Sequence, residues 1–193
     1  MKFYFSHGRT ALKYGLIYLS LKKNDCIMMP DYFCDILMDP LNDLGIKPIF
    51  YNINRDFTTD WKSLSKNYKK KVKALLFINY FGYEENKKKF KTFCKRKKIF
   101  LIEDDCHSIT VGKLNKKPVS DAIFYSVKKI VKSAYSGGVL EINQKINENK
   151  LVNMKLKKYR INLFERLNNF FEINYLSLKR QLKYFFLKKP NYT

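Results

Sequence analysis

Short apolar runs alternate with stretches of helical spacing through most of the chain. The sequence predicts strands at six apolar runs, over residues 26–29, 48–53, 72–81, 99–104, 122–126 and 138–142. Apolar positions three or four residues apart predict helices over residues 10–21, 33–44 and 84–98, with a short polar helix over 60–68. Nearly continuous apolar strands separated by helices are typical of a parallel sheet covered on both faces. The pattern therefore predicts an α/β fold with a mostly parallel sheet flanked by helices.

The pattern changes after the last predicted strand. Between residues 151 and 193, Lys and Arg far outnumber Glu, and apolar side chains recur at steps of three and four. This spacing predicts basic amphipathic helices. We therefore expect two parts, an α/β domain over residues 1–148 and a helical tail over 149–193. The tail has two open interpretations: it packs on the domain or a partner subunit, or it lies on a membrane surface where its cations meet anionic headgroups.

The bulk composition fits a folded domain of this kind. A hydrophobic fraction of 46% in 193 residues argues against disorder, although 29% of the residues are charged. No apolar run reaches the ~18 residues of a membrane-spanning helix, and the N-terminal apolar stretch is too short for a signal peptide. We therefore expect a cytoplasmic protein. The four cysteines form no CxxC pair, so we predict neither a metal site nor a disulfide framework.

The formal net charge of the chain is +22. Such an excess can attract nucleic acid or anionic lipid. The lysines, however, are scattered through almost every segment, and no zinc-finger, helix-turn-helix or RNA-recognition signature accompanies them. We therefore expect no specific binding of nucleic acid.

Polar side chains follow several of the predicted strands. Asn79, Asp104, His107 and Ser126 each lie at or just past the end of an apolar run. In sheets of parallel strands, ligands bind beyond the carboxyl ends of the strands. We therefore expect these four residues to face one crevice.

The segment around Asp104 and His107 suits a charged aromatic ligand. A buried carboxylate at a strand end is costly unless it meets a positive partner, and a protonated pyridine nitrogen is such a partner. His107, three residues later, would then contact a phenolic oxygen or a phosphate. The alternative interpretation is a solvated acidic turn with a surface histidine.

Two further segments supply a phosphate turn and an amine. Gly8 precedes the first predicted helix, where free backbone N–H groups favour a phosphate, and Thr10 adds a hydroxyl; a plain turn is the alternative. Ser126 and Lys129 are three residues apart, and a lysine amine can form a Schiff base with an aldehyde. Lys128 is the rival for that role.

Six motifs in this order resemble the DegT/DnrJ-type sugar aminotransferases, which are pyridoxal-phosphate enzymes of the aspartate-aminotransferase fold. The motifs are HGRTAL (7–12), LSLKKNDCIMMPDYFC (19–34), GIKPIFYNIN (45–54), LLFINYFGYEEN (75–86), LIEDDCHS (101–108), and SDAIFYSVKK (120–129) followed by SGG (136–138). The resemblance implies that the α/β part is the large domain of such an enzyme and that its cofactor is pyridoxal 5'-phosphate.

The resemblance also implies roles for individual residues. Asp104 matches the aspartate that pairs with the pyridine nitrogen, His107 the family's Gln or His beside the ring, and Lys129 the Schiff-base lysine. The residue that stacks on the ring falls near 32–34. Ser126 matches a phosphate ligand. The phosphate turn of the family is matched by Gly8, Arg9 and Thr10.

The chain departs from the family pattern in three places. Family members are usually about twice as long and have a C-terminal small domain that helps to bind the substrate. From the length of this sequence we expect that domain to be truncated or absent. The spacing from the lysine to the Gly-Gly pair is one residue longer than expected, which keeps Lys128 open. Asp105 replaces a usually small residue and adds charge beside Asp104.

The function implied by the resemblance is transfer of an amino group to a keto group on a nucleotide-linked sugar, in the biosynthesis of surface polysaccharide. The amino donor would be glutamate, and the protein would be a homodimer with sites at the subunit interface. Two alternatives stay open. One is a truncated, inactive paralogue that keeps the fold, and the other is a basic protein that associates with membrane surfaces through its C-terminal helix.

Overall fold

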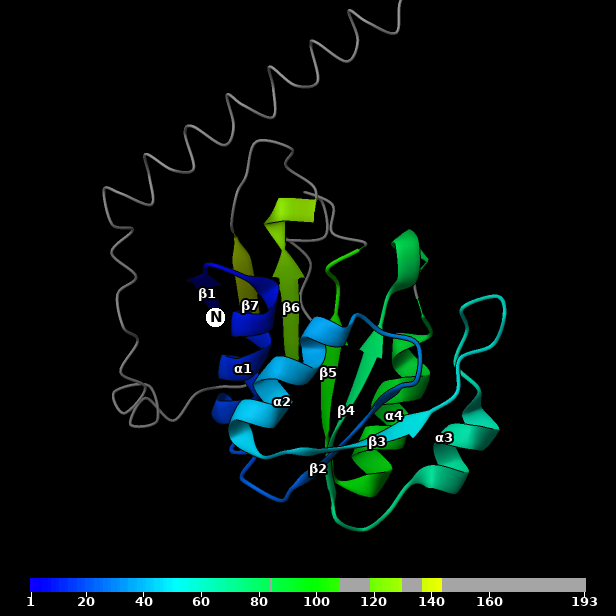
Figure 1. The fold of residues 1–193 in the computed structure, drawn as a ribbon. Coiled ribbons are helices and arrows are strands. Elements are labelled where there is room, and N and C mark those ends of the chain that lie inside the picture. The colour runs from blue at the N-terminus through cyan, green and yellow to red at the C-terminus, as the bar shows by residue number, and fades with distance from the viewer. Residues whose placement is uncertain (84, 108–118, 130–136, 144–193) are drawn as a thin grey trace, which may run out of the picture. The chain divides into compact units, whose positions relative to one another are not determined.

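The computed structural model describes residues 1–83, 85–107, 119–129 and 137–143. In this part of the chain the strands form one sheet in the order β1-β7-β6-β5-β4-β2-β3 (Figure 1). The strands are β1 (Lys2–Phe5), β2 (Cys26–Pro30), β3 (Lys47–Tyr51), β4 (Val72–Ile78), β5 (Phe100–Asp104), β6 (Ala122–Ser126) and β7 (Gly138–Ile142). Neighbouring strands from β3 to β6 pair in parallel, whereas β7 is antiparallel to both β6 and β1. The predicted mostly parallel α/β sheet is confirmed.

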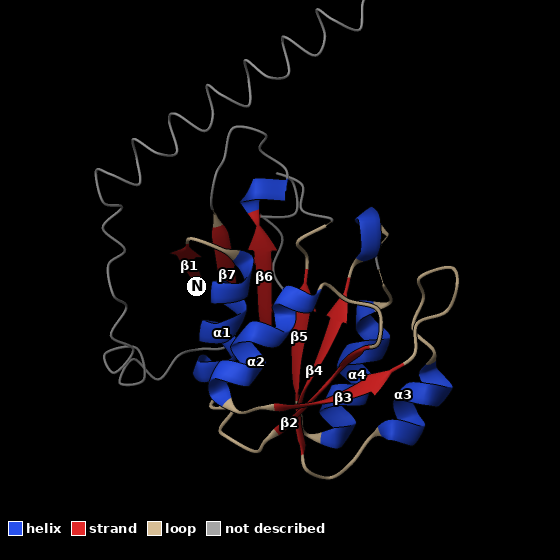
Figure 2. Ribbon diagram, viewed as in Figure 1, coloured by secondary structure: helices blue, strands red, loops and turns tan. Residues whose placement is uncertain are grey.

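Helices cover both faces of this sheet (Figure 2). One face carries α1 (Gly8–Tyr18) and α2 (Met38–Leu44), and the other carries α3 (Trp61–Asn67) and α4 (Lys87–Lys97). Short 3₁₀ turns occupy Asp35–Leu37, Tyr80–Gly82 and Val127–Lys129. The four predicted helices are all present, with shifted ends.

Local chemistry explains where these helices begin and end. The predicted helix over 33–44 starts as α-helix only at Met38, because Pro40 lacks an N–H and is tolerated only in a first turn. Gly45 ends it with a φ of 64°, in the left-handed region where glycine is favoured. The side chain of Asp60 accepts hydrogen bonds from Lys62 N and Ser63 N and so caps α3.

Two parts of the sheet differ from the sequence-based prediction. Strand β1 was not predicted; it pairs with β7 at the edge of the sheet, and its residues alternate between exposed and half-buried. The strand predicted over 72–81 ends at Ile78 instead. Beyond it the chain turns, because Phe81 has a φ of 51° that no strand can accommodate.

The core consists of one apolar layer on each face of the sheet. On the α1 side, Leu12 and Leu16 belong to a cluster with Leu76, Phe124 and Leu140. A second cluster on the α4 side includes Phe77, Phe90, Phe93 and Leu64. The rings of Phe77 and Phe90 stack with centroids 4.5 Å apart. Both layers pack against the strands and so determine where the strand ends lie relative to one another.

Several predictions concern residues outside the described part. The helical tail predicted over 149–193, and any membrane contact through it, lies there. Among the described residues, no helix has the length and apolar character to cross a membrane. The same residues contain no group of three or more His, Cys, Asp or Glu arranged to hold a metal ion.

Candidate functional site

The carboxyl ends of β4, β5 and β6 lie side by side. Ile78 pairs with Asp104 and Asp104 with Phe124, so the three strands reach the edge of the sheet together. The backbone N–H of Asn79 donates to the carbonyl of Asp104 at 3.0 Å. The structure thus brings the backbones of Asn79 and Asp104 together, but the Asn79 side chain is 0% exposed and donates to Glu103 and Asp105, so the expectation that it faces the crevice is wrong.

The carboxyl group of Asp104 is buried at this edge. Its residue is 5% exposed, and Oδ1 accepts a hydrogen bond from Cys106 N at 2.9 Å. Burial raises the pKa of Asp104 to about 6, although the hydrogen bonds from Cys106 and the more distant charge of Lys129 oppose the rise. In the described part of the chain, no cation forms an ion pair with this carboxyl.

His107 and Lys129 meet across the same edge. Nζ of Lys129 lies 2.5 Å from Nε2 of His107. Burial, and then the charge of Lys129, lower the pKa of His107, so the imidazole is neutral at pH 7. A neutral Nε2 accepts a hydrogen bond from the ammonium group. Both side chains are exposed, so this pair is open to a ligand.

The first turn of α1 reaches this edge through Gly8. A Cβ built on Gly8 would lie 3.2 Å from Sγ of Cys106 and 3.4 Å from Cβ of Ser126. The N-cap residue His7 accepts no hydrogen bond from the turn through its side chain. The first backbone N–H groups of a helix have no acceptor within the helix. The helix start, Ser126 and the Asp104 loop are therefore neighbours.

Arg9 and Thr10 lie on the side of α1 that faces α2. Nε of Arg9 is 3.9 Å from Oδ2 of Asp39, and both Arg9 and Thr10 line a cleft of about 460 Å³ between the two helices. Their side chains thus belong to the α1–α2 contact, and their backbone N–H groups belong to the helix start.

An aromatic group at the carboxyl edge was missed by the sequence analysis, apart from its first member. Tyr32, Phe57, Tyr80 and Phe81 have neighbouring ring centroids 5.2–6.4 Å apart, and the ring of Phe81 is 5.6 Å from that of His107. The hydroxyl of Tyr80 donates to the carbonyl of Tyr32. The available signal in the sequence was that each of these aromatic residues lies within six positions after the end of β2, β3 or β4.

Two aromatic residues within 32–34 are candidates for stacking on the ring of a ligand, and the structure places them differently. The ring of Phe33 stacks on Phe50 at 5.6 Å and packs against the core. Tyr32 is 54% exposed and belongs to the aromatic group beside His107. Tyr32 is therefore the candidate in this segment for covering a ring.

An exposed amine–imidazole pair, a buried carboxyl and a helix start converge at the carboxyl edge of a mostly parallel sheet, as in α/β domains that bind a phosphorylated ligand. The model of the DegT/DnrJ/EryC1/StrS aminotransferase family matches residues 4–159. The chain belongs to this family.

Relatives of known structure or function support this assignment. The chain is 25% identical over 134 residues to UDP-4-amino-4,6-dideoxy-N-acetyl-beta-L-altrosamine transaminase from Helicobacter pylori. The aligned residues cover 67% of this chain and 35% of that protein. The chain therefore spans about a third of the length of this curated relative.

Two solved structures share the fold. NtdA from Bacillus subtilis with bound cofactor PMP has a TM-score of 0.68 and 23% identity, covering 81% of this chain and 38% of that chain. GDP-4-keto-6-deoxy-D-mannose-3-dehydratase from E. coli with bound hydrated PLP has a TM-score of 0.64 and 24% identity. The match covers 74% of this chain and 39% of that chain. The fold of the described part is thus that of the aminotransferase large domain.

Proposed function

We propose that this chain carries the cofactor site of a pyridoxal-phosphate-dependent aminotransferase. The observation that carries the proposal is the pairing of Lys129 with His107 at 2.5 Å, on the edge where the buried Asp104 ends β5. An amine that can bond to an aldehyde and a carboxyl that can pair with a ring nitrogen are groups that such a cofactor uses, and His107 would lie beside them. The family match and the cofactors printed for the solved neighbours support the proposal.

The buried carboxyl of Asp104 fits the ring nitrogen of this cofactor. A buried carboxyl without a cation in contact is costly when ionised, and this cost raises its pKa to about 6. A protonated ring nitrogen would supply the missing cation. Asp104 would thereby hold the proton on that nitrogen.

The start of α1 fits the phosphate group. The absence of a side chain at Gly8 lets the helix start lie close to Cys106 and Ser126, and the backbone N–H groups of Gly8, Arg9 and Thr10 begin the helix. Helix starts of this kind favour anions. Ser126, half-buried at the end of β6, would add a hydroxyl donor.

When bound, the cofactor supplies an aldehyde that bonds to amines and a ring that accepts electrons. Lys129 would provide the amine and afterwards carry a proton at Nζ to and from the substrate carbon. His107 would orient that Nζ through its neutral Nε2. The rings of Tyr32 and Phe81 would exclude water from the site.

The substrate that we propose is a keto group on a nucleotide-linked sugar, with glutamate as amino donor. The Helicobacter relative is a transaminase of a UDP-linked amino sugar, which supports this class. We further propose that the protein is cytoplasmic, acts as a homodimer, and contributes to the biosynthesis of surface polysaccharide. The family match favours this function over a basic membrane-surface protein.

The test is spectroscopic. The purified chain is incubated with pyridoxal phosphate, its visible absorption is recorded, and borohydride reduction followed by peptide mapping locates the modified lysine. We expect a visible band that Lys129→Ala abolishes and Lys128→Ala, the matched control, preserves. Modification of Lys128 instead would reassign the amine, and absence of any band would refute the cofactor.

A half-reaction assay separates the enzyme from a fold that is inactive. With glutamate, an active protein converts the bound cofactor to its amine form, and the visible band disappears. A band that persists in glutamate would favour the inactive paralogue.

A further inference from the structure

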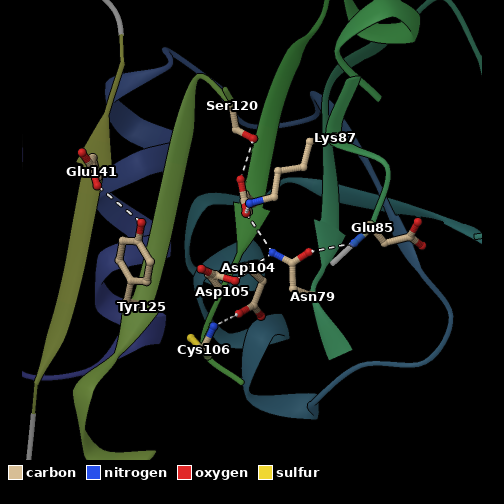
Figure 3. A network of polar contacts seen from close by, with 10 residues as sticks. Asn79, Glu85, Lys87, Asp104, Asp105, Cys106, Ser120, Tyr125 and Glu141 are labelled. Carbon is tan, nitrogen blue, oxygen red and sulfur yellow. Dashed lines mark hydrogen bonds and ion pairs between the residues drawn. The ribbon is translucent and has the colours of Figure 1, made fainter. Parts of the chain in front are cut away.

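A buried polar network lies on the α4 face of the sheet, next to the Asp104 loop (Figure 3). Asn79, Glu103 and Ser120 are 0% exposed, and Asp105 is 2% exposed. Glu103 belongs to β5, and the others lie in the segments that follow β4, follow β5 and precede β6. The network therefore spans the three strands whose ends form the proposed cofactor site.

Asn79 is the centre of this network. Its Nδ2 donates to Oε1 of Glu103 at 2.8 Å and to Oδ1 of Asp105 at 2.7 Å. Its Oδ1 accepts from Glu85 N at 3.3 Å. Both amide protons and the amide oxygen are thus used, which fixes the orientation of the side chain.

The two carboxylates of the network have different partners. Glu103 pairs with the ammonium of Lys87 and accepts from Ser120 Oγ at 2.9 Å. Asp105 accepts a hydrogen bond from the amide of Asn79. A charge buried this deeply is weakly screened by solvent, so it acts on groups several ångströms away.

The same residues hold the backbone on both sides of Asp104. The N–H of Asn79 donates to the carbonyl of Asp104, and the N–H of Asp105 donates to the carbonyl of Phe124, each at 3.0 Å. The Asp104 peptide is therefore fixed between β4 and β6, with the Asp105 carboxylate one residue beyond it. A displacement of Asp105 would move the Asp104 carboxyl.

We propose that Asp105, held by Asn79, is a positioning residue that fixes the Asp104 carboxyl and adds negative charge behind it, so that the site selects a cationic ring nitrogen. The inference rests on the proposed function, because that nitrogen belongs to the proposed cofactor. Asp104 makes the contact, and Asp105 makes that contact stronger for a cation than for a neutral ring.

The test compares two ligands. One is pyridoxal phosphate, and the other is its analogue in which carbon replaces the ring nitrogen and no cation forms. Their dissociation constants are measured by fluorescence quenching for the wild type, Asp105→Asn and Glu141→Gln. Asp105→Asn removes the charge at nearly constant volume. Glu141→Gln is the matched control, since Glu141 is also a buried carboxylate, on β7, with Tyr125 OH at 3.4 Å.

We expect Asp105→Asn to weaken the binding of pyridoxal phosphate about tenfold, the effect of a nearby weakly screened charge. Binding of the carbon analogue should stay within about twofold of the wild type, since its ring carries no charge that depends on Asp105. Glu141→Gln should bind both ligands as the wild type does. Circular dichroism of all three proteins checks that the fold is kept.

Two results would overturn the inference while the proposed function stands. One is an equal loss of affinity for both ligands in Asp105→Asn, which would mean that Asp105 only supports the fold. The other is unchanged binding of pyridoxal phosphate in that variant. A wild type that binds neither ligand would refute the proposed function, and the inference with it.

Discussion

Nζ of Lys129 lies 2.5 Å from Nε2 of His107, although the two residues come from different strand ends and are 22 positions apart in the chain. The contact joins the turn after β6 to the turn after β5. The amine of the proposed site therefore has a defined orientation before any ligand arrives. Preorganisation of this kind reduces the cost of placing a reacting group.

The charge of Lys129 should be visible in the titration of His107. Burial and Lys129 both lower the pKa of His107. Lys129→Ala removes the second cause, so we expect the pKa of His107 to rise toward its usual value of about 6.5 but to stay below it because burial remains. The measurement is a proton NMR titration of the imidazole signals.

Lys13→Ala is the matched control for this titration, because Nζ of Lys13 pairs with Oδ2 of Asp43 at 2.7 Å. The His107 signal should titrate identically in the wild type and in Lys13→Ala. A His107 titration unaffected by Lys129→Ala would contradict the observed contact.

The buried carboxyl of Asp104 should make stability depend on pH. Its pKa is raised from 3.8 to about 6, by burial first and also by Asp105, against the opposing effects of Cys106 and Lys129. Because the folded-state pKa exceeds the unfolded value, the folded state binds this proton more tightly. The stabilisation of the folded state that this tighter proton binding gives is fully present below about pH 4. It is lost as the pH rises through about 6.

The size of this effect follows from the shift. A difference of about two pKa units corresponds to about 3 kcal/mol in the free energy of unfolding. The free energy of unfolding is measured with urea at pH 4.5 and at pH 7.5. The difference between its two values should be smaller for Asp104→Asn than for the wild type. Other carboxyl groups titrate equally in both proteins, so equal pH dependence would show that Asp104 is not the group responsible.

Much of the site was predictable because parallel strands end at one edge. The positions of Asp104, His107 and Ser126 follow from the order of apolar runs, since each follows a strand of the same direction. The pairing of Lys129 with His107 did not follow, because it depends on the path of two turns. The roles given to these residues remain predictions.

The network and the aromatic group could not be predicted for a related reason. Asn79 contacts Glu103 and Asp105, which are 24 and 26 positions away, so only the sheet register brings them together. Phe81 joins the aromatic group through a backbone with a φ of 51°, a local conformation that no periodicity reports. Strand β1 was missed because a four-residue edge strand carries too short a pattern.

The close approach of the helix start to Cys106 and Ser126 at Gly8 should matter for phosphate binding more than for folding, because a side chain there would move the first N–H groups of the helix. Gly8→Ala would place a Cβ 3.2 Å from Sγ of Cys106, a tight contact that a small shift relieves, and alanine favours helix. We expect stability within about 1 kcal/mol of the wild type and an affinity for pyridoxal phosphate lower by about tenfold, or ~1.4 kcal/mol. Isothermal titration calorimetry measures the affinity.

Gly15→Ala is the matched control on the same helix. Its Cβ would meet the Cδ1 of Leu140 at 3.1 Å, on the core side and away from the helix start. This variant should bind pyridoxal phosphate as the wild type does. If both substitutions weaken binding equally, the effect comes from a general shift of α1, and the start of the helix has no special role.

Gly138 determines how closely the chain before α1 approaches β7. A Cβ on Gly138 would lie 2.1 Å from the carbonyl oxygen of His7 and 2.9 Å from N of Gly8, and both are backbone atoms that side-chain rotation cannot move. Gly138→Ala must therefore displace the start of α1 from Ser126, which pairs with Gly138 in the sheet. We expect a loss of about 3 kcal/mol in unfolding free energy together with weaker binding of pyridoxal phosphate. Urea unfolding and calorimetry measure the two effects; normal stability with normal affinity would show that this close approach does not position the helix.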